Sequence, residues 1–490
     1  MLQMRTSEKN KRIHSSLEDF QGGVLSWRFL ALLFLAGCVA FDAIQYLVPL
    51  DNATPLLFLF YPASLIVFGF LAYECRYVEY AEIRFLFLFI LWMCASVVLN
   101  HSRAHIVDSY SWFASVCVTS FLCFSFPYAF AKRGASRVLT VLAATTLAAV
   151  TLLSAVGLIG VLAKNVAERM PTLFTGFGLY NGRLTLDSNP NRSAPYCAVA
   201  VVLTGYLLVH TKKALPRILA SIGGVICFVT LALTDSRTAI VATSVAVGFE
   251  VFILSNVWLP RIGSLKKTRA ALRVVICAAL MCIAVVACYK GAGLVRNAYV
   301  AYSSKADDSA AAVAVEEPQP SAASQPEADS TPAQPARSIA DLESVNIRLD
   351  IWTGVLKGLA QNPRMLAIGT GPAVASGLMT PYFPEGSPIG IFHSSLLGTL
   401  VSFGIVGLVF ALVFLLIVAI AAVKFSFGGL TNADTLAVRL LPAMLLFTVF
   451  ESMMEDFLFV NGGLNITWIW FMFSAGFVLR FLRPEPAPEA

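Results

Sequence analysis

Charged side chains are scarce in this chain, and this scarcity excludes a soluble globular protein. Of the 490 residues, only 13% are Asp, Glu, Lys or Arg, whereas 58% are hydrophobic. Soluble domains of ordinary composition have about 25% charged residues. The composition therefore predicts a protein that crosses a membrane several times.

The sequence also lacks metal-site or disulfide patterns of cysteine and nucleotide-binding motifs, and this narrows the class of membrane protein. The last of the ten cysteines is Cys288, and all of them lie in or beside apolar runs, where a thiol behaves as a small apolar side chain. Their spacing favours neither a zinc site nor a disulfide framework. The chain also lacks a Walker motif and a Rossmann fingerprint, which argues against an energy-coupled pump. We expect the protein to use no cofactor.

Long apolar runs, in contrast, are abundant. A helix of roughly 20 residues crosses a hydrocarbon core of about 30 Å. The runs therefore predict an all-α integral membrane protein with about twelve transmembrane helices. They lie near residues 28–50, 55–73, 83–99, 109–131, 138–163, 193–210, 217–234, 238–259, 271–290, 395–423, 436–455 and 464–483.

Basic residues predict the orientation of these helices, because cytoplasmic loops retain Lys and Arg. The basic clusters lie before the first apolar run or next to the end of an even-numbered run, which places them all on one side of the membrane. They are Arg5, Lys9, Lys11 and Arg12; Lys132, Arg133 and Arg137; Lys212, Lys213 and Arg217; Arg261, Lys266, Lys267 and Arg269; Arg480 and Arg483. We expect a cytoplasmic N-terminal segment at 1–27, helices one to nine within 28–290, helices ten to twelve within 393–483 and a cytoplasmic tail at 484–490. These loops explain the net charge of +6, so no nucleic-acid partner is implied.

One connection on the outer face, residues 291–392, is far longer than the others. Within it, residues 303–337 are rich in Ala, Pro, Ser and Glu and contain no aromatic residue, so they cannot bury enough apolar surface to fold. We expect a disordered insert there, followed by an amphipathic helix at 338–362. That helix is predicted from apolar residues at helical spacing, namely Leu349, Trp352, Val355, Leu356 and Leu359.

Ionisable residues at the outer ends of spans are functional candidates, because charge at membrane depth is costly. Arg237 lies in a connection so short that Asp235 or Ser236 is expected to cap the next helix; the alternative is that Arg237 reaches lipid head groups. His393 immediately precedes the apolar run that begins at Ser394. Its ring would lie at a helix N-terminus, which favours neutral imidazole and attracts phosphate, although a water-satisfied interfacial histidine is the simpler interpretation of His393 alone.

The acidic residues allow two interpretations. Glu451 and Glu455 are four residues apart and share a helix face, with Asp456 next to them. They can pair with arginine or bind a divalent metal, and we favour pairing because no other carboxylate cluster falls on the outer side. We therefore expect no metal site. A separate group on the cytoplasmic side is expected to form a solvated face: Glu74, Glu79 and Glu82.

Three motifs together resemble the O-antigen ligase and polymerase family, which are integral membrane glycosyltransferases of the C-type architecture. The first is Ser-Arg-Thr around Arg237. The second is Arg-x-x-x-Trp starting at Arg348, followed by a Gly-x-Gly turn, and the third is His393 before a span with Phe-Gly-Ile-Val-Gly-Leu. The resemblance covers residues 234–238 and 348–408. It departs from the family pattern at Ser394, where Asn is common.

The resemblance implies an enzyme of the bacterial inner membrane that transfers a glycan from undecaprenyl diphosphate to lipid A core at the periplasmic face. Arg237 and Arg348 would hold the diphosphate, since arginine is permanently charged and can bind phosphate oxygens bidentately. His393 would act as general base. Other residues expected to contact substrate are Arg192, Trp352, Ser394, Glu451 and Glu455.

The motifs leave other activities open. A polymerase of O-antigen or exopolysaccharide and a protein O-oligosaccharyltransferase would use the same donor chemistry. A twelve-span transporter is the non-enzyme alternative. It predicts two similar halves and polar residues near mid-membrane, whereas the charges here gather at the outer ends of the spans.

Overall fold

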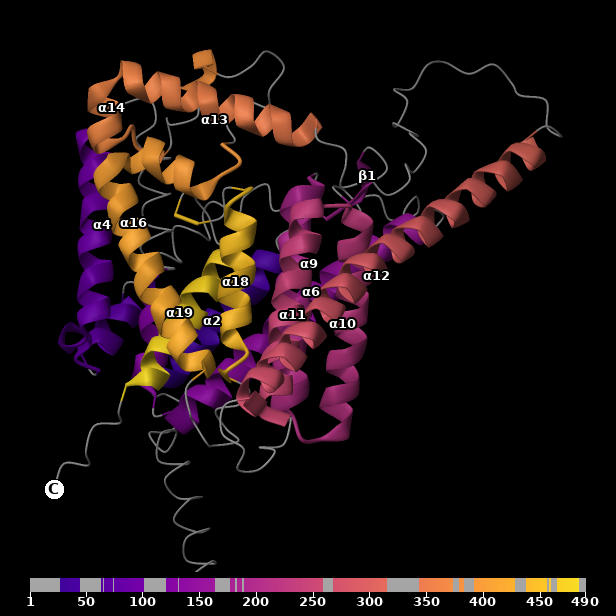
Figure 1. Cartoon of the computed structure of the whole chain (residues 1–490), viewed down its shortest axis with the longest axis horizontal. Helices are drawn as coiled ribbons and strands as arrows, with labels where there is room; N and C mark the ends of the chain where they lie inside the picture. The colour runs from indigo at the N-terminus through magenta and orange to yellow at the C-terminus, as the bar shows by residue number, and fades with distance from the viewer. Residues whose placement is uncertain are drawn as a thin grey trace, which may run out of the picture.

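A computed structural model shows a bundle of long helices, with one further helix lying across their upper ends in the view of Figure 1. The structure describes residues 27–44, 63–64, 66–73, 75–100, 120–130, 132–163, 177–180, 183–186, 189–258, 268–314, 343–372, 379–382, 392–427, 438–455, 458–459 and 465–483.

The long helices of the bundle are α2 (Trp27–Ile44), α4 (Ala81–Leu99), α6 (Lys132–Leu162), α9 (Pro190–His210), α10 (Ala214–Thr234), α11 (Arg237–Trp258), α12 (Thr268–Ala314) and α16 (Ser395–Phe427). Shorter helices are η1 (Tyr77–Glu79), η3 (Phe126–Ala129), α13 (Glu343–Gln361), α14 (Pro363–Ile368), η4 (Thr380–Tyr382), α18 (Leu441–Ser452) and α19 (Ile466–Leu482). Strands β1 (Gly178–Tyr180) and β2 (Arg183–Thr185) form an antiparallel hairpin.

Within the described residues, seven helices are long and apolar enough to cross a membrane. They are Ala81–Leu99, Gly134–Leu162, Pro190–His210, Ala214–Thr234, Arg237–Asn256, Val274–Ser303 and Ser395–Phe427. Shorter apolar helices cover Arg28–Phe41, Ser120–Ala129, Leu441–Ser452 and Ile466–Leu482. The all-α membrane architecture is confirmed, while the count of twelve stays a prediction.

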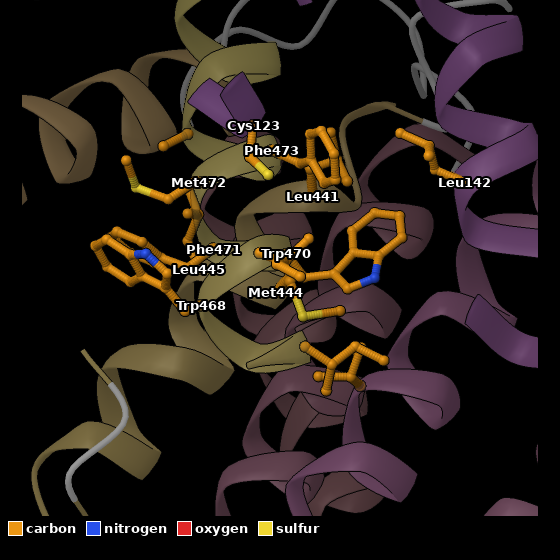
Figure 2. Close-up of a cluster of buried hydrophobic side chains, with 14 of the residues drawn as sticks. Cys123, Leu142, Leu441, Met444, Leu445, Trp468, Trp470, Phe471, Met472 and Phe473 are labelled. Atoms are coloured by element: carbon orange, nitrogen blue, oxygen red, sulfur yellow. The ribbon is translucent and has the colours of Figure 1, made fainter. Parts of the chain in front are cut away.

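An aromatic core joins the C-terminal helices to the early ones. Trp470 of α19 is fully buried and its indole N–H donates to Thr146 Oγ1 of α6 at 2.9 Å. A buried indole needs such a partner. Figure 2 shows Trp470 among apolar side chains that include Met444 and Phe473. This packing fixes α18 and α19, and therefore the end of α18 that carries the acidic residues.

Helix α16 is broken at Gly404, whose φ of 68° and ψ of −172° are not helical. The break leaves carbonyl groups in the preceding turn without their helical N–H partners. The turn after α14 supplies replacements: Thr370 N–H donates to Val401 O and Gly371 N–H donates to Ser402 O, both at 2.9 Å. The Gly-x-Gly turn and the Phe-Gly motif are thus one structural unit.

Helix α4 completes this unit from the side. The indole N–H of Trp92 donates to Phe403 O at 2.9 Å. The hydroxyl of Ser96 lies 2.8 Å from Ile368 O and 3.1 Å from Ser402 O, so it bridges α14 and α16. Non-helical backbone at membrane depth is tolerated only when its polar groups are satisfied in this way. The first half of α16 is therefore held in a defined position.

One expectation for the long connection needs correction, and the structure adds detail to another. Disorder was expected from residue 303, yet α12 continues as a helix to Ala314; residues 315–337 lie outside the described part. The Ala-rich stretch favours helix, because alanine has the highest helix propensity. Helix α13 is present within the expected 338–362, but Leu349 and Leu356 are 48% and 53% exposed.

The buried face of α13 instead carries Ile351, Val355 and Leu359, each at most 1% exposed, with Trp352 packed beside them. This stripe packs against Leu400 and Val401 of α16, among other residues. The helix covers the bundle with this face and leaves its two outer leucines exposed.

The expected solvated face at Glu82 is wrong. Glu82 is 8% exposed, and its Oε1 accepts from Tyr128 at 2.7 Å and from Nε of Arg483 at 2.8 Å. A buried carboxylate requires such partners. Glu79 is 63% exposed and pairs only loosely with Arg76, as expected of a surface residue, and Glu74 lies outside the described residues.

Candidate active site

His393 lies directly before α16 in an unusual backbone conformation. Its φ of 50° is in the left-handed region, which is uncommon for residues other than glycine and tends to occur at functional sites. The backbone of the preceding residue, Phe392, is fixed by α13, because the indole N–H of Trp352 donates to Phe392 O at 2.9 Å. Trp352 was expected to contact substrate, but its polar atom supports the backbone next to His393.

Three side chains, those of His393, Glu455 and Arg348, meet at this point. His393 Nδ1 lies 3.1 Å from Glu455 Oε2, and Arg348 Nη2 donates to Glu455 Oε1 at 2.8 Å. All three side chains are largely buried, with exposed fractions of 14%, 9% and 17% for His393, Glu455 and Arg348. The expected pairing of the acidic group with arginine is therefore observed for Glu455.

The carboxylate determines which nitrogen of His393 can accept a proton. Glu455 can only accept a hydrogen bond when ionised, so we assign the ring proton to Nδ1 from this partner. Nε2 then carries the lone pair. A carboxylate that orients imidazole and stabilises its protonated form is the arrangement used by general bases in acyl transfer. The cluster can therefore take a proton from a substrate hydroxyl.

Two serines at the start of α16 form hydrogen bonds with nearby backbone groups. The Ser394 hydroxyl accepts from the N–H of Leu397 at 3.5 Å, so a hydroxyl does cap the helix at this position. Ser395, which was not singled out from the sequence, donates to Glu455 O and accepts from the N–H of Leu458, both at 2.9 Å. Ser395 thus fixes the backbone of Glu455, and only its place in the first turn of a helix pointed to it.

Glu451 does not reach a substrate surface. Its side chain is fully buried, and within the described residues neither carboxylate oxygen has a hydrogen-bond partner. It lies close enough to Glu455 and Arg348 to interact electrostatically with both. The expectation of direct substrate contact is therefore wrong for Glu451 in this conformation, because α18 turns this residue into the bundle. Asp456 lies outside the described residues.

Arg237 occupies a different place, in a pocket between the C-terminal end of α10, the N-terminal end of α11 and the middle of α12. The pocket has a volume of about 370 Å³, and its charged lining residues are Asp235, Arg237, Lys290 and Arg296. Arg237 is half-buried at the first residue of α11. Ser236 is the capping position, since its carbonyl accepts from the N–H of Ile240 at 2.9 Å.

Lys290 and Arg296 were missed because the ninth span was expected to end at residue 290, and the residues beyond it were assigned to a loop. The signal was present in the sequence as two basic residues six positions apart on one continuous helix. Arg192, in contrast, is exposed on the first turn of α9 and is not among the described residues that line this pocket.

Another arginine missed from the sequence, Arg183 of β2, stabilises this region. Its Nε donates to Thr234 O at the end of α10 at 2.8 Å, and its Nη2 donates to Asn191 Oδ1 of α9 at 2.7 Å. It satisfies a carbonyl that the end of a helix leaves free. The hairpin thereby fixes the two helix ends near Arg237. The part of the chain that the structure describes contains no group of three or more His, Cys, Asp or Glu side chains able to hold a metal ion.

These features define a class: an all-α membrane protein with a base, a carboxylate and basic side chains at the ends of its spans. The family follows from the sequence of the same region. Residues 222–412 match the family model described as O-antigen ligase, and this match supports membership of that family. The match includes Arg237, Arg348 and His393 and ends before Glu455. No curated protein matches the chain significantly.

The match supports a ligase or polymerase type of function in lipopolysaccharide biosynthesis and a glycosyltransferase-like enzyme. It also suggests lipid-linked glycan and lipid acceptor substrates in general terms.

Proposed function

We propose that this protein is an O-antigen ligase of the bacterial inner membrane. It transfers a glycan from undecaprenyl diphosphate to lipid A core oligosaccharide, with the site on the periplasmic side of a twelve-helix bundle and residues 291–392 as its large periplasmic loop. The observation that carries the proposal is the convergence of Arg348, Glu455 and His393 at the start of α16.

The acceptor hydroxyl attacks C1 of the donor sugar in a direct displacement. As the new C–O bond forms, the bond between C1 and the diphosphate oxygen breaks and its electron pair leaves with the phosphate. The hydroxyl proton passes to Nε2 of His393, and Glu455 stabilises the resulting imidazolium. One displacement inverts the anomeric centre.

Arginine supplies the positive charge that the departing diphosphate needs, so the reaction proceeds without a metal ion. Arg237 holds the diphosphate in the pocket at α10–α12. Arg348 uses one N–H for Glu455 and has further N–H donors for phosphate oxygens. The exposed Arg192 contacts more distant parts of the substrate, and Ser394 shapes the start of α16 beside the acceptor.

Replacing Glu455 by glutamine should lower kcat by at least about 100-fold, because a neutral amide cannot stabilise the imidazolium or enforce its tautomer. The KM for the donor should change less than kcat, since the role proposed for Glu455 is to stabilise the imidazolium of His393. Kinetics of the purified enzyme with lipid-linked glycan and core acceptor test this. Glu79→Gln is the matched control, because Glu79 is exposed and pairs only loosely with Arg76. A Glu455→Gln enzyme with normal kcat would refute the role of this carboxylate.

The acceptor is tested in cells that lack this protein. We expect lipopolysaccharide with bare core, together with long glycan retained on the polyprenyl carrier. Core that carries a single repeat unit would instead show a polymerase. An unchanged lipopolysaccharide profile would redirect attention to protein glycosylation or to transport. A gel of lipopolysaccharide, with lipid-linked glycan analysed in parallel, distinguishes the three.

A further inference from the structure

Two hydrogen bonds fix the backbone on either side of His393. The indole N–H of Trp352 donates to Phe392 O at 2.9 Å. The hydroxyl of Ser395 donates to Glu455 O, also at 2.9 Å. We propose that Trp352 and Ser395 are positioning residues for His393, which hold its imidazole against the carboxylate and keep the ring proton on Nδ1. The proposal rests on the proposed function for the role of His393 as a base, and it deepens that function by naming the residues that prepare the base.

The backbone of His393 requires such support. Its φ of 50° lies in the left-handed region, which residues other than glycine adopt where the surrounding structure imposes it. Phe392, directly before it, is 2% exposed and belongs to the apolar cluster that contains the buried face of α13. Only one residue besides His393 lies between Phe392 and Ser395. The unusual conformation is therefore fixed at both ends of a very short segment.

Ser395 also fixes the segment that carries the carboxylate. Glu455 lies beyond the end of α18, and the Ser395 hydroxyl that donates to its carbonyl accepts from the N–H of Leu458 at 2.9 Å. The next residue, Phe459, has a φ of 62°, which is rare for a bulky side chain. Its ring packs edge-on against Trp468, with centroids 4.9 Å apart. This turn is therefore anchored to the aromatic core on one side and to the first residue of α16 on the other.

These contacts decide which nitrogen of His393 is available as a base. A neutral imidazole carries its proton on either nitrogen, and the hydrogen-bond partner selects which one. Nδ1 of His393 lies 3.1 Å from Glu455 Oε2, near the long end of the usual range for such a bond. A shift of about 1 Å between the two backbones would break this bond, and a misplacement of that size can cost about 100-fold in rate. Loss of the support from Trp352 or Ser395 should therefore release the tautomer and slow the reaction.

The test observes the tautomer directly. Solid-state nitrogen NMR of the full-length protein in lipid bilayers, isotope-labelled at histidine and measured at mildly alkaline pH, distinguishes protonated from unprotonated ring nitrogens. The chain has five histidines, and the spectrum of His393→Asn assigns the signals of His393 by difference. We expect a protonated Nδ1 in the wild type and a mixture of both tautomers in Ser395→Ala and in Trp352→Phe.

The same two variants should lower kcat by about 10- to 100-fold, with a smaller change in the KM for the donor. Ser426→Ala is the control for Ser395→Ala, because Ser426 is a buried serine of the same helix whose hydroxyl donates within that helix. Trp92→Phe is the control for Trp352→Phe. It removes an indole bond of the same length, to Phe403 O, and should leave the tautomer unchanged. Thermal unfolding checks the fold of each variant, and Trp352→Phe tests the same support from another helix if Ser395→Ala does not fold.

A wild-type tautomer in both Ser395→Ala and Trp352→Phe would overturn the proposal, and so would a proton on Nε2 of His393 in the wild-type protein. Loss of activity in these variants without a change of tautomer would also overturn it, because the two residues would then act by another route. A changed tautomer with a wild-type kcat would leave the positioning of His393 intact and count against its proposed role as base. Failure of this proposal and failure of the proposed function therefore give different results.

Discussion

Replacing His393 by alanine is expected to abolish glycan transfer, with a loss of about 100- to 10,000-fold in kcat. The acceptor hydroxyl then has no group to take its proton, while the pocket at Arg237, proposed to hold the diphosphate, is unchanged. Donor binding should therefore persist. Turnover of lipid-linked glycan by the purified protein, measured beside donor binding, tests both statements.

His393→Asn provides a second variant for the same prediction. Asparagine tolerates the left-handed backbone that His393 adopts, yet it cannot accept a proton at neutral pH. Thr353→Ala is the control, because Thr353 is exposed on α13 and its hydroxyl bonds only within its own helix. If either His393 variant turned over at the rate of the wild type, His393 would be an ordinary interfacial residue.

Alanine at Gly404 or Gly369 is expected to destabilise the protein by more than about 3 kcal/mol and to abolish activity. Both glycines have φ near the left-handed range with extended ψ, 68° and −172° for Gly404 and 80° and −171° for Gly369. A Cβ on Gly404 would collide with the backbone of Ala367, and one on Gly369 with the backbone of Ser402. Because these neighbours are backbone atoms, they cannot move aside cheaply.

Gly37→Ala is the matched control for the two glycines. Gly37 lies in α2 and a Cβ there would meet no atom within 4 Å, so alanine should stabilise the helix by about 0.5–1 kcal/mol. Thermal unfolding in detergent, followed by size-exclusion chromatography, measures all three variants. Wild-type unfolding temperatures for Gly404→Ala and Gly369→Ala would show that the break in α16 is not needed.

Much of the fold was predictable because the hydrophobic signal is local. The runs at 83–99, 138–163, 193–210, 217–234, 238–259, 271–290 and 395–423 each overlap a helix able to cross a membrane. In α13 the spacing of apolar residues predicted a helix; within that spacing Val355 and Leu359 are buried, whereas Leu349 and Leu356 are exposed. Helical spacing restricts a stripe to one side, and only the neighbouring elements decide which residues of that stripe are covered.

Most residues of the candidate site could be predicted from the sequence, but the contacts between them could not. Arg237, Arg348 and His393 were identified by motif, and all three lie within the region that matches the O-antigen ligase family. Their grouping was not predictable, since Arg348 and His393 meet at Glu455 whereas Arg237 lines a pocket with α12. Glu451 and Glu455 share a helix face, yet Glu451 is fully buried with no hydrogen-bond partner among the described residues, whereas Glu455 binds both Arg348 and His393.

The sequence by itself determined that the chain is an all-α membrane protein, because the transfer free energy of apolar side chains into lipid adds up residue by residue along the chain. Only the tertiary structure decided which polar groups act together. Arg348 and Glu455 are 107 residues apart, and the contact that joins α4 to the break in α16 spans 311. Interactions over such separations depend on how the helices pack, and no spacing along the sequence records that packing.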